Sequence, residues 1–119
     1  MTRILLAACV LSVAMAHAQA PERPAAAAPP GNADAGKTLY VSVGCYQCHG
    51  YEAQGSSATG PRLGPRPIAF AAFSRYLRQP TGQMPPYTAK VVSDADLANL
   101  YAFVRSRPEP AKEISLLRP

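Results

Sequence analysis

The chain has 119 residues, is 48% hydrophobic, and carries a formal net charge of +5 from 12 Lys and Arg against 7 Asp and Glu. The first 32 residues read as an export signal and a linker, which leaves 76 residues (33–108) for one folded domain and excludes a multidomain enzyme. This domain has no Trp and few large side chains, so we expect a disulfide, a metal or a cofactor to support its core.

Residues 1–18 have the three parts of a secretory signal peptide. Arg3 supplies the positive start, residues 4–15 are apolar, and Ala16-His17-Ala18 places small residues where a signal peptidase cuts. The apolar segment is shorter than the roughly 20 residues that span a bilayer as a helix. We therefore expect cleavage after Ala18 and location in the periplasm. Loss of Arg3 lowers the net charge to +4, from 11 basic and 7 acidic residues.

Two other interpretations of this N-terminus stay open. Leu6-Ala7-Ala8-Cys9 matches a bacterial lipoprotein motif in which Cys9 would carry the lipid, and the apolar segment could also remain uncleaved as a membrane anchor. No later segment is apolar over the length that a membrane-spanning helix needs. The mature protein is therefore expected to have no transmembrane segment.

The linker at residues 19–32 contains four prolines around an alanine run, a composition that cannot form a core. Asn32 is predicted to cap a first helix that ends near Val43, because Leu39, Tyr40 and Val43 share one apolar face. Gly36 lies one turn before Tyr40, where a missing side chain would let another helix approach.

A Gly- and Pro-rich loop without periodicity covers residues 50–67, and a loop this long in a small domain is usually functional. A second helix of about eleven residues is predicted between Pro67 and Pro80. A third begins at Ser93, which forms a capping-box pattern with Asp96, and it ends before Pro108. No segment alternates like a strand, so the predicted fold class is all-α, with three main helices.

The stretch Cys45-Tyr46-Gln47-Cys48-His49 reads C-x-x-C-H, the attachment motif of c-type haem. The two thiols lie about one helical turn apart, so both can add to the vinyl groups on one edge of the macrocycle. The next residue, His49, then projects under the ring, where its imidazole can ligate the iron. The motif predicts one covalently attached haem c, held through Cys45 and Cys48.

Residue counting weakens the alternatives to haem. The mature chain has only two Cys and one His, whereas a structural zinc site needs four such ligands and a blue-copper site needs two His. A thioredoxin-like dithiol would need a βαβ context that the sequence lacks. A plain disulfide between Cys45 and Cys48 would leave His49 unexplained.

Met84 is the only methionine of the mature chain and lies between Gly82-Gln83 and Pro85-Pro86, in a stiff loop. A lone Met usually fills a core gap, but a stiff loop suits a ligand that must be held at a fixed distance from iron. We therefore predict that His49 and Met84 are the two metal ligands. Such ligation raises the reduction potential and fills both axial sites, which disfavours catalysis at the iron.

With these residues, the sequence resembles the class I cytochrome c-like monohaem family over residues 33–107. The resemblance implies a small all-α bundle wrapped around one haem, in which the first and last helices cross near a glycine and an aromatic residue. Gly36 and Tyr40 would meet Leu97 and Tyr101 at that crossing.

The resemblance also implies two residues that would support the haem. In Gly60-Pro61-Arg62-Leu63, the carbonyl of Pro61 would accept a hydrogen bond from the proximal His49 and fix its orientation. Leu63 would pack on the haem.

The family's frequent propionate-binding Trp is missing, so Arg62, Arg66 and Tyr87 are candidate propionate donors. Two ionised propionates would lower the net charge from +4 to about +2, which does not identify a partner. The basic residues are scattered, which argues against a nucleic-acid partner. The tail at 109–119 contains an apolar patch that could fold on the core or dock on a partner.

The predicted function is one-electron transfer in the periplasm by a carrier that is not an enzyme, with a dehydrogenase, an oxidase or another cytochrome as redox partner. One alternative is a cytochrome subunit bound tightly to a periplasmic dehydrogenase complex. A haem peroxidase or gas sensor would need an open sixth site.

Overall fold

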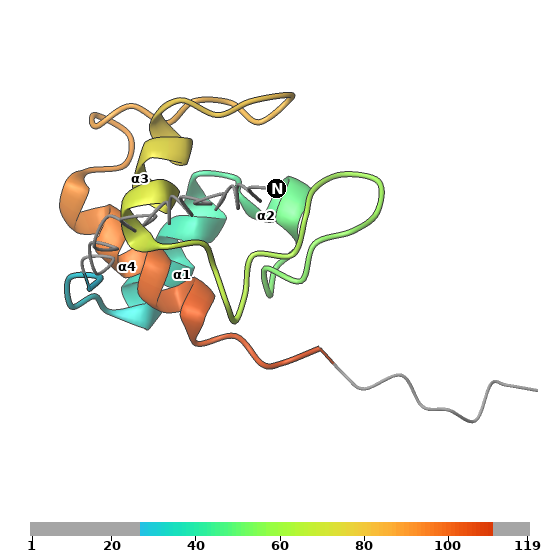
Figure 1. Cartoon of the computed structure of the whole chain (residues 1–119), viewed down its shortest axis with the longest axis horizontal. Helices are drawn as coiled ribbons and strands as arrows, with labels where there is room; N and C mark the ends of the chain where they lie inside the picture. Colours follow the sequence, from blue (N-terminus) through green and yellow to red (C-terminus); the bar gives the residue numbers. More distant parts are fainter. Residues whose placement is uncertain (1–26, 111–119) are drawn as a thin grey trace, which may run out of the picture.

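Four helices and the loops between them make up residues 27–110, the part of the chain that this computed structural model describes (Figure 1). They are α1 (Ala33–Ser42), α2 (Tyr46–His49), α3 (Phe70–Arg78) and α4 (Asp94–Arg105). Residues 27–110 form no strand, only an isolated bridge between Ser56 and Gly60. The predicted all-α class is confirmed.

Several predictions concern residues outside this range. The expected signal peptide (1–18), the first part of the linker (19–26) and the tail from residue 111 onward are not described. Among the described residues, no helix is both long enough and apolar enough to cross a membrane.

The predicted caps of the first and last helices are present. The Asn32 side chain accepts a hydrogen bond from the Ala35 amide at 2.8 Å. Ser93 and Asp96 form a complete capping box, in which each side chain bonds the other residue's backbone N–H. These bonds satisfy amides that would otherwise lack partners, so both helices begin where the sequence predicts.

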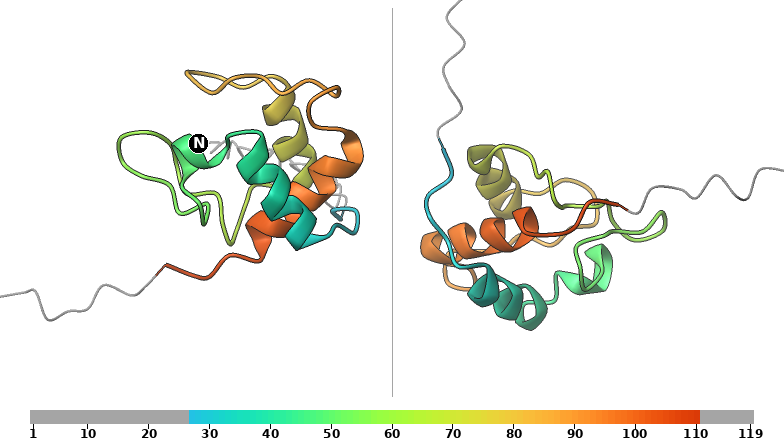
Figure 2. Two further views of the ribbon diagram at one scale, coloured as in Figure 1. Left: turned by 180° about the vertical axis from the view of Figure 1, so that it is seen from behind. Right: turned by 90° about the horizontal axis from the view of Figure 1, so that it is seen from below.

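Helices α1 and α4 lie side by side in each view (Figure 2) and form the main helix contact of the molecule. A Cβ atom on Gly36 would lie 2.0 Å from the Asn99 carbonyl oxygen and 2.9 Å from the Phe103 Cβ, so only glycine fits at the crossing. The rings of Tyr40 and Phe103 pack beside it with centroids 5.0 Å apart. Gly36 and Tyr40 therefore occupy the crossing as expected.

Of the two α4 residues predicted at this crossing, Leu97 and Tyr101, the prediction for Tyr101 was wrong. Asn99 and Phe103 meet α1, whereas Tyr101 faces α3, where its ring lies 5.2 Å from those of Phe70 and Phe73. The reason is that α4 is buried on two sides. Positions two apart on a helix point about 200° apart, so Tyr101 and Phe103 serve opposite neighbours.

The second main helix also differs from the prediction, because α3 begins at Phe70 and not at Pro67. Ala69 is extended (φ −50°, ψ 143°) and has no side-chain cap. The Ile68 carbonyl accepts a hydrogen bond from the Tyr101 hydroxyl at 3.1 Å, which ties this extended entry to α4. Residues 67–69, which the sequence pattern assigned to the helix, thus lie before it, and a tertiary hydrogen bond to α4 holds them there.

Candidate haem site

One cavity of about 760 Å³ lies between α2, the 50–69 loop, α3, the 79–93 loop and α4. All nine site residues predicted from the sequence line it, namely Cys45, Cys48, His49, Pro61, Arg62, Leu63, Arg66, Met84 and Tyr87. Pockets for small molecules and cofactors typically measure roughly 300–1,000 Å³ and are mostly apolar. The structure thus brings together residues that are up to 42 positions apart in the sequence.

The two cysteines of the motif lie at the start and in the body of the short helix α2. Cys45 occupies the N-cap position and Cys48 the third helical position. Both thiols are free, and Cys48 is more exposed than Cys45. Burial raises the pKa of the Cys45 thiol, although the neighbouring Tyr87 hydroxyl acts in the opposite direction. A thiol-redox pair needs a lowered pKa, so this environment does not favour one.

The imidazole of His49 is 8% exposed and faces the cavity wall formed by the 50–69 loop. Its Nδ1 lies 2.8 Å from the Pro61 carbonyl oxygen. A carbonyl oxygen only accepts, so Nδ1 carries the proton and Nε2 keeps a free lone pair. The contact expected for Pro61 is therefore present, and it leaves the outer ring nitrogen available as a metal ligand.

The Met84 side chain is partly buried in the wall formed by the 79–93 loop. Hydrogen bonds join this loop to the C-terminal end of α3. The Arg78 guanidinium donates to the carbonyl oxygens of Tyr87 (2.9 Å) and Val92 (2.7 Å), and the Tyr87 amide donates to the Leu77 carbonyl (2.9 Å). Sequence reasoning assigned no role to Arg78, because a basic residue off the apolar stripe reads as solvent-exposed.

The three candidate propionate donors lie at the cavity in different environments. The Tyr87 hydroxyl donates to the Val43 carbonyl at 3.2 Å, and burial raises its pKa to about 12. Arg66 is exposed and pairs with Glu109 at 3.1 Å. Arg62 is exposed, and its guanidinium donates one long hydrogen bond, to the Gly64 carbonyl oxygen at 3.4 Å. Of the three, Arg62 has the least engaged side chain.

Several lining residues were not identified as site residues from the sequence. Apolar side chains of α3 and α4 form the inner wall, and further polar groups come from Tyr76 and Gln83. The apolar lining residues of α3 and α4 could be recognised from the sequence as parts of apolar helical stripes, namely Phe73, Leu77, Leu100 and Val104. Nothing in the local sequence distinguishes Tyr76 or Gln83 as cavity residues.

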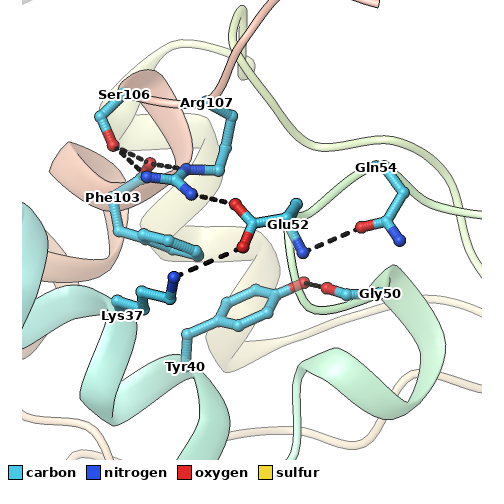
Figure 3. A network of polar contacts seen from close by, with 8 residues as sticks. All are labelled: Lys37, Tyr40, Gly50, Glu52, Gln54, Phe103, Ser106 and Arg107. Atoms are coloured by element: carbon cyan, nitrogen blue, oxygen red, sulfur yellow. Dashed lines mark hydrogen bonds and ion pairs between the residues drawn. The ribbon is translucent and has the colours of Figure 1, made fainter.

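Outside the cavity, an ion-pair cluster formed by Lys37, Glu52 and Arg107 joins α1, the 50–69 loop and the end of α4 (Figure 3). We call it the Glu52 cluster. Burial acts to raise the pKa of the Glu52 carboxyl, but its hydrogen bonds to Arg107 and Lys37 outweigh this and hold the pKa below its usual value. The Glu52 carboxylate therefore stays ionised at neutral pH.

Comparison with known families agrees with this geometry. A family model described as "Cytochrome C oxidase, cbb3-type, subunit III" matches residues 31–104, well over half of the chain. The chain belongs to this family. No curated protein and no solved structure gives a significant match. As a cytochrome c domain, the chain acts in haem-based electron transfer, as the motif predicted.

The residues of this cytochrome c domain fit a haem. The cavity is lined mainly by apolar groups, and it presents two free thiols one helical turn apart and an imidazole with its outer nitrogen unused. Among residues 27–110, no three His, Cys, Asp or Glu side chains lie together as a metal-ligand set. The described part of the chain therefore offers donors suited to haem and not to a structural zinc ion.

Proposed function

We propose that this chain is an exported monohaem c-type cytochrome that carries single electrons between redox proteins. The observation that supports this proposal is the shared cavity of Cys45, Cys48, His49 and Met84, with Nδ1 of His49 already bonded to Pro61. A bound haem supplies exchange of one electron between ferric and ferrous iron.

In this proposal, the protein's own groups divide the work of holding the cofactor. The thiols of Cys45 and Cys48 would hold the haem through two thioether links, and His49 Nε2 and Met84 Sδ would be the iron ligands. Leu63 and the apolar wall exclude water, and Arg62, Arg66 and Tyr87 are the proposed partners of the propionates. With two iron ligands supplied by the chain, a substrate would have no open site at the iron, which favours electron transfer over catalysis.

We further propose that the protein works in the periplasm. The support is the sequence of residues 1–18, with its positive start, short apolar segment and small residues before Gln19. N-terminal sequencing of the exported protein should begin at Gln19. A lipid-modified Cys9 or an intact N-terminus would contradict this location signal while leaving the haem proposal standing.

The main test is expression with a haem-attachment system, followed by denaturation, haem staining and a redox titration. We expect one haem per chain that stays bound after denaturation, and a reversible one-electron transition. Cys45→Ala and Cys48→Ala should each leave at most one thioether link. Absence of any redox transition in the haem-loaded protein would refute electron transfer.

A second candidate is a cytochrome subunit held permanently in a larger respiratory complex. The observation in its favour is the description of the matching family model, which names a subunit of an oxidase. The partner in such a complex would be an oxidase or a dehydrogenase. Purification under mild conditions separates the candidates, because a permanent subunit leaves the column with its complex and a diffusing carrier leaves alone.

A further inference from the structure

The loop that carries Pro61 is closed at its base by backbone hydrogen bonds from the amides of residues 63 and 64 to the Ala53 carbonyl oxygen. The Leu63 amide donates to the Ala53 carbonyl oxygen at 2.9 Å. Ala53 is fully buried and adopts a left-handed conformation (φ 52°), which a non-glycine residue keeps only where its surroundings hold it. The base of the loop is therefore a fixed point, and Pro61 lies two residues from it.

Arg107 contacts both sides of this base. Its guanidinium pairs with the Glu52 carboxylate on one side (Figure 3). On the other side, a Cβ atom on Gly64 would lie 2.8 Å from the Cβ and Cγ atoms of Arg107, so the two residues pack without space between them. The Arg107 side chain thus bridges residues 52 and 64, the two ends of the loop.

Arg107 is itself held rigidly against α4. Its guanidinium carbon lies 4.1 Å from the centroid of the Phe103 ring, and its Nε donates to the Phe103 carbonyl at 3.1 Å. A further hydrogen bond of 2.9 Å joins Nη2 to the Ser106 hydroxyl. The Arg107 side chain is only 15% exposed, so the bridge has one defined position.

The same loop meets His49 at two atoms. The Gly55 amide donates to the His49 carbonyl at 2.7 Å, and the Pro61 carbonyl lies 2.8 Å from the ring Nδ1. Neither Glu52 nor Arg107 lines the cavity. Apart from the effect of their charges, these two residues therefore act on His49 through the loop that holds Pro61.

We propose that Arg107 and Glu52 are positioning residues that hold the Pro61 carbonyl against Nδ1 of His49 and so set how strongly this imidazole donates to the haem iron. This inference rests on the proposed role of His49 as iron ligand. A hydrogen bond from Nδ1–H to a carbonyl raises the basicity of a metal-bound imidazole. Loosening that bond weakens donation, favours ferrous iron and raises the reduction potential.

A positioning role and a simple charge effect predict shifts of the reduction potential with different signs, so the two can be distinguished. If only charge acts, then loss of the Arg107 cation lowers the reduction potential and loss of the Glu52 anion raises it. If positioning acts, Arg107→Gln and Glu52→Gln both loosen the Pro61 loop and both raise the potential. Arg107→Lys keeps the charge but loses the planar fork, so it raises the potential only if positioning acts.

The experiment measures the reduction potentials of the haem-loaded wild type and these three variants at one pH and ionic strength. Arg105→Gln and Arg105→Lys are matched controls, because Arg105 is exposed and its guanidinium lies over the Tyr101 ring and forms no ion pair with Glu52. We expect a shift of the same sign in all three test variants. The same variants should also show faster solvent exchange of the His49 Nδ1 proton by NMR, and the controls should not.

Opposite shifts for Arg107→Gln and Glu52→Gln, with no shift for Arg107→Lys, would overturn the positioning role. If Arg107→Gln fails to fold, Arg107→Lys against Arg105→Lys still decides the question. A wild type that takes up no haem would overturn the proposed function and this inference together. A redox-active wild type with shifts of opposite sign would overturn the inference alone.

Discussion

Replacement of Arg78 tests whether this side chain, which lies outside the haem motif of residues 45–49, holds the 79–93 loop and its Met84 in place. Arg78 is 23% exposed and donates two hydrogen bonds to loop carbonyls, of Tyr87 and Val92, and one to the Asp94 carboxylate. Arg78→Gln removes the two carbonyl contacts, and Val92 is fully buried, so water reaches its carbonyl poorly.

The structure sets the size of the expected effect. Hydrogen bonds from a charged group contribute about 1.5–3 kcal/mol each, so loss of two at this partly exposed site costs about 3 kcal/mol. A domain of this size loses about 4–8 °C in Tm per kcal/mol, which gives a decrease of about 12–24 °C. Asp94→Asn is the matched control. Its carboxylate is 93% exposed, so it contributes at most about 1 kcal/mol.

The assay is thermal unfolding of the haem-loaded protein by circular dichroism, with amide hydrogen exchange over residues 79–92 as a local readout. Arg78→Gln should increase exchange of the Tyr87 amide, which bonds the Leu77 carbonyl, and Asp94→Asn should leave it protected. If the two variants unfold at the same temperature, the carbonyl contacts of Arg78 do not stabilise the loop and the reasoning is wrong.

Three further predictions follow from the fold and the site. Gly36→Ala should lower the free energy of unfolding by about 1–3 kcal/mol in denaturant titrations, because the new Cβ meets the Asn99 carbonyl; an unchanged midpoint would contradict the close crossing. As the pH falls from about 5 to 3, the wild type should lose more stability than Glu52→Gln. The pKa of the Glu52 carboxyl is lower in the folded chain than its unfolded value near 4.3, so its ionised form stabilises the fold above about pH 4.3 and this contribution is lost on acidification. Parallel profiles of unfolding free energy against pH for the two proteins would contradict this prediction. Met84→Ala should change the visible spectrum and lower the reduction potential, while Met84→Leu separates loss of the sulfur from loss of bulk; an unchanged spectrum in both would show that Met84 is not a ligand.

Features that depend only on residues close together in the sequence were predictable. The caps at Asn32 and Ser93 need only a side chain and an amide three residues away, and the structure has both. The motif from Cys45 to His49 is equally local, because five consecutive residues carry the chemistry. The fold class followed from helical periodicity and the lack of alternation.

Features that depend on tertiary neighbours were not predictable. Tyr101 and Phe103 are both aromatic, and the sequence does not say which one faces α1 and which one faces α3. The late start of α3 depends on the Tyr101 hydroxyl, which is 33 residues from the carbonyl it binds. The Glu52 cluster joins three separate segments, and each of its charges looks like an ordinary surface residue in the sequence.

The placement of α4 between two neighbours also limits how this protein can change over evolutionary time. Six of its twelve residues are buried, and others meet α1 or cap the helix. Substitutions there disturb two packing surfaces at once, whereas the exposed segments of the 50–69 and 79–93 loops accept changes in length and composition. We therefore expect divergent relatives to keep the pattern of α4, the haem motif, Pro61 and Met84 long after the exposed segments of the two loops have become unrecognisable.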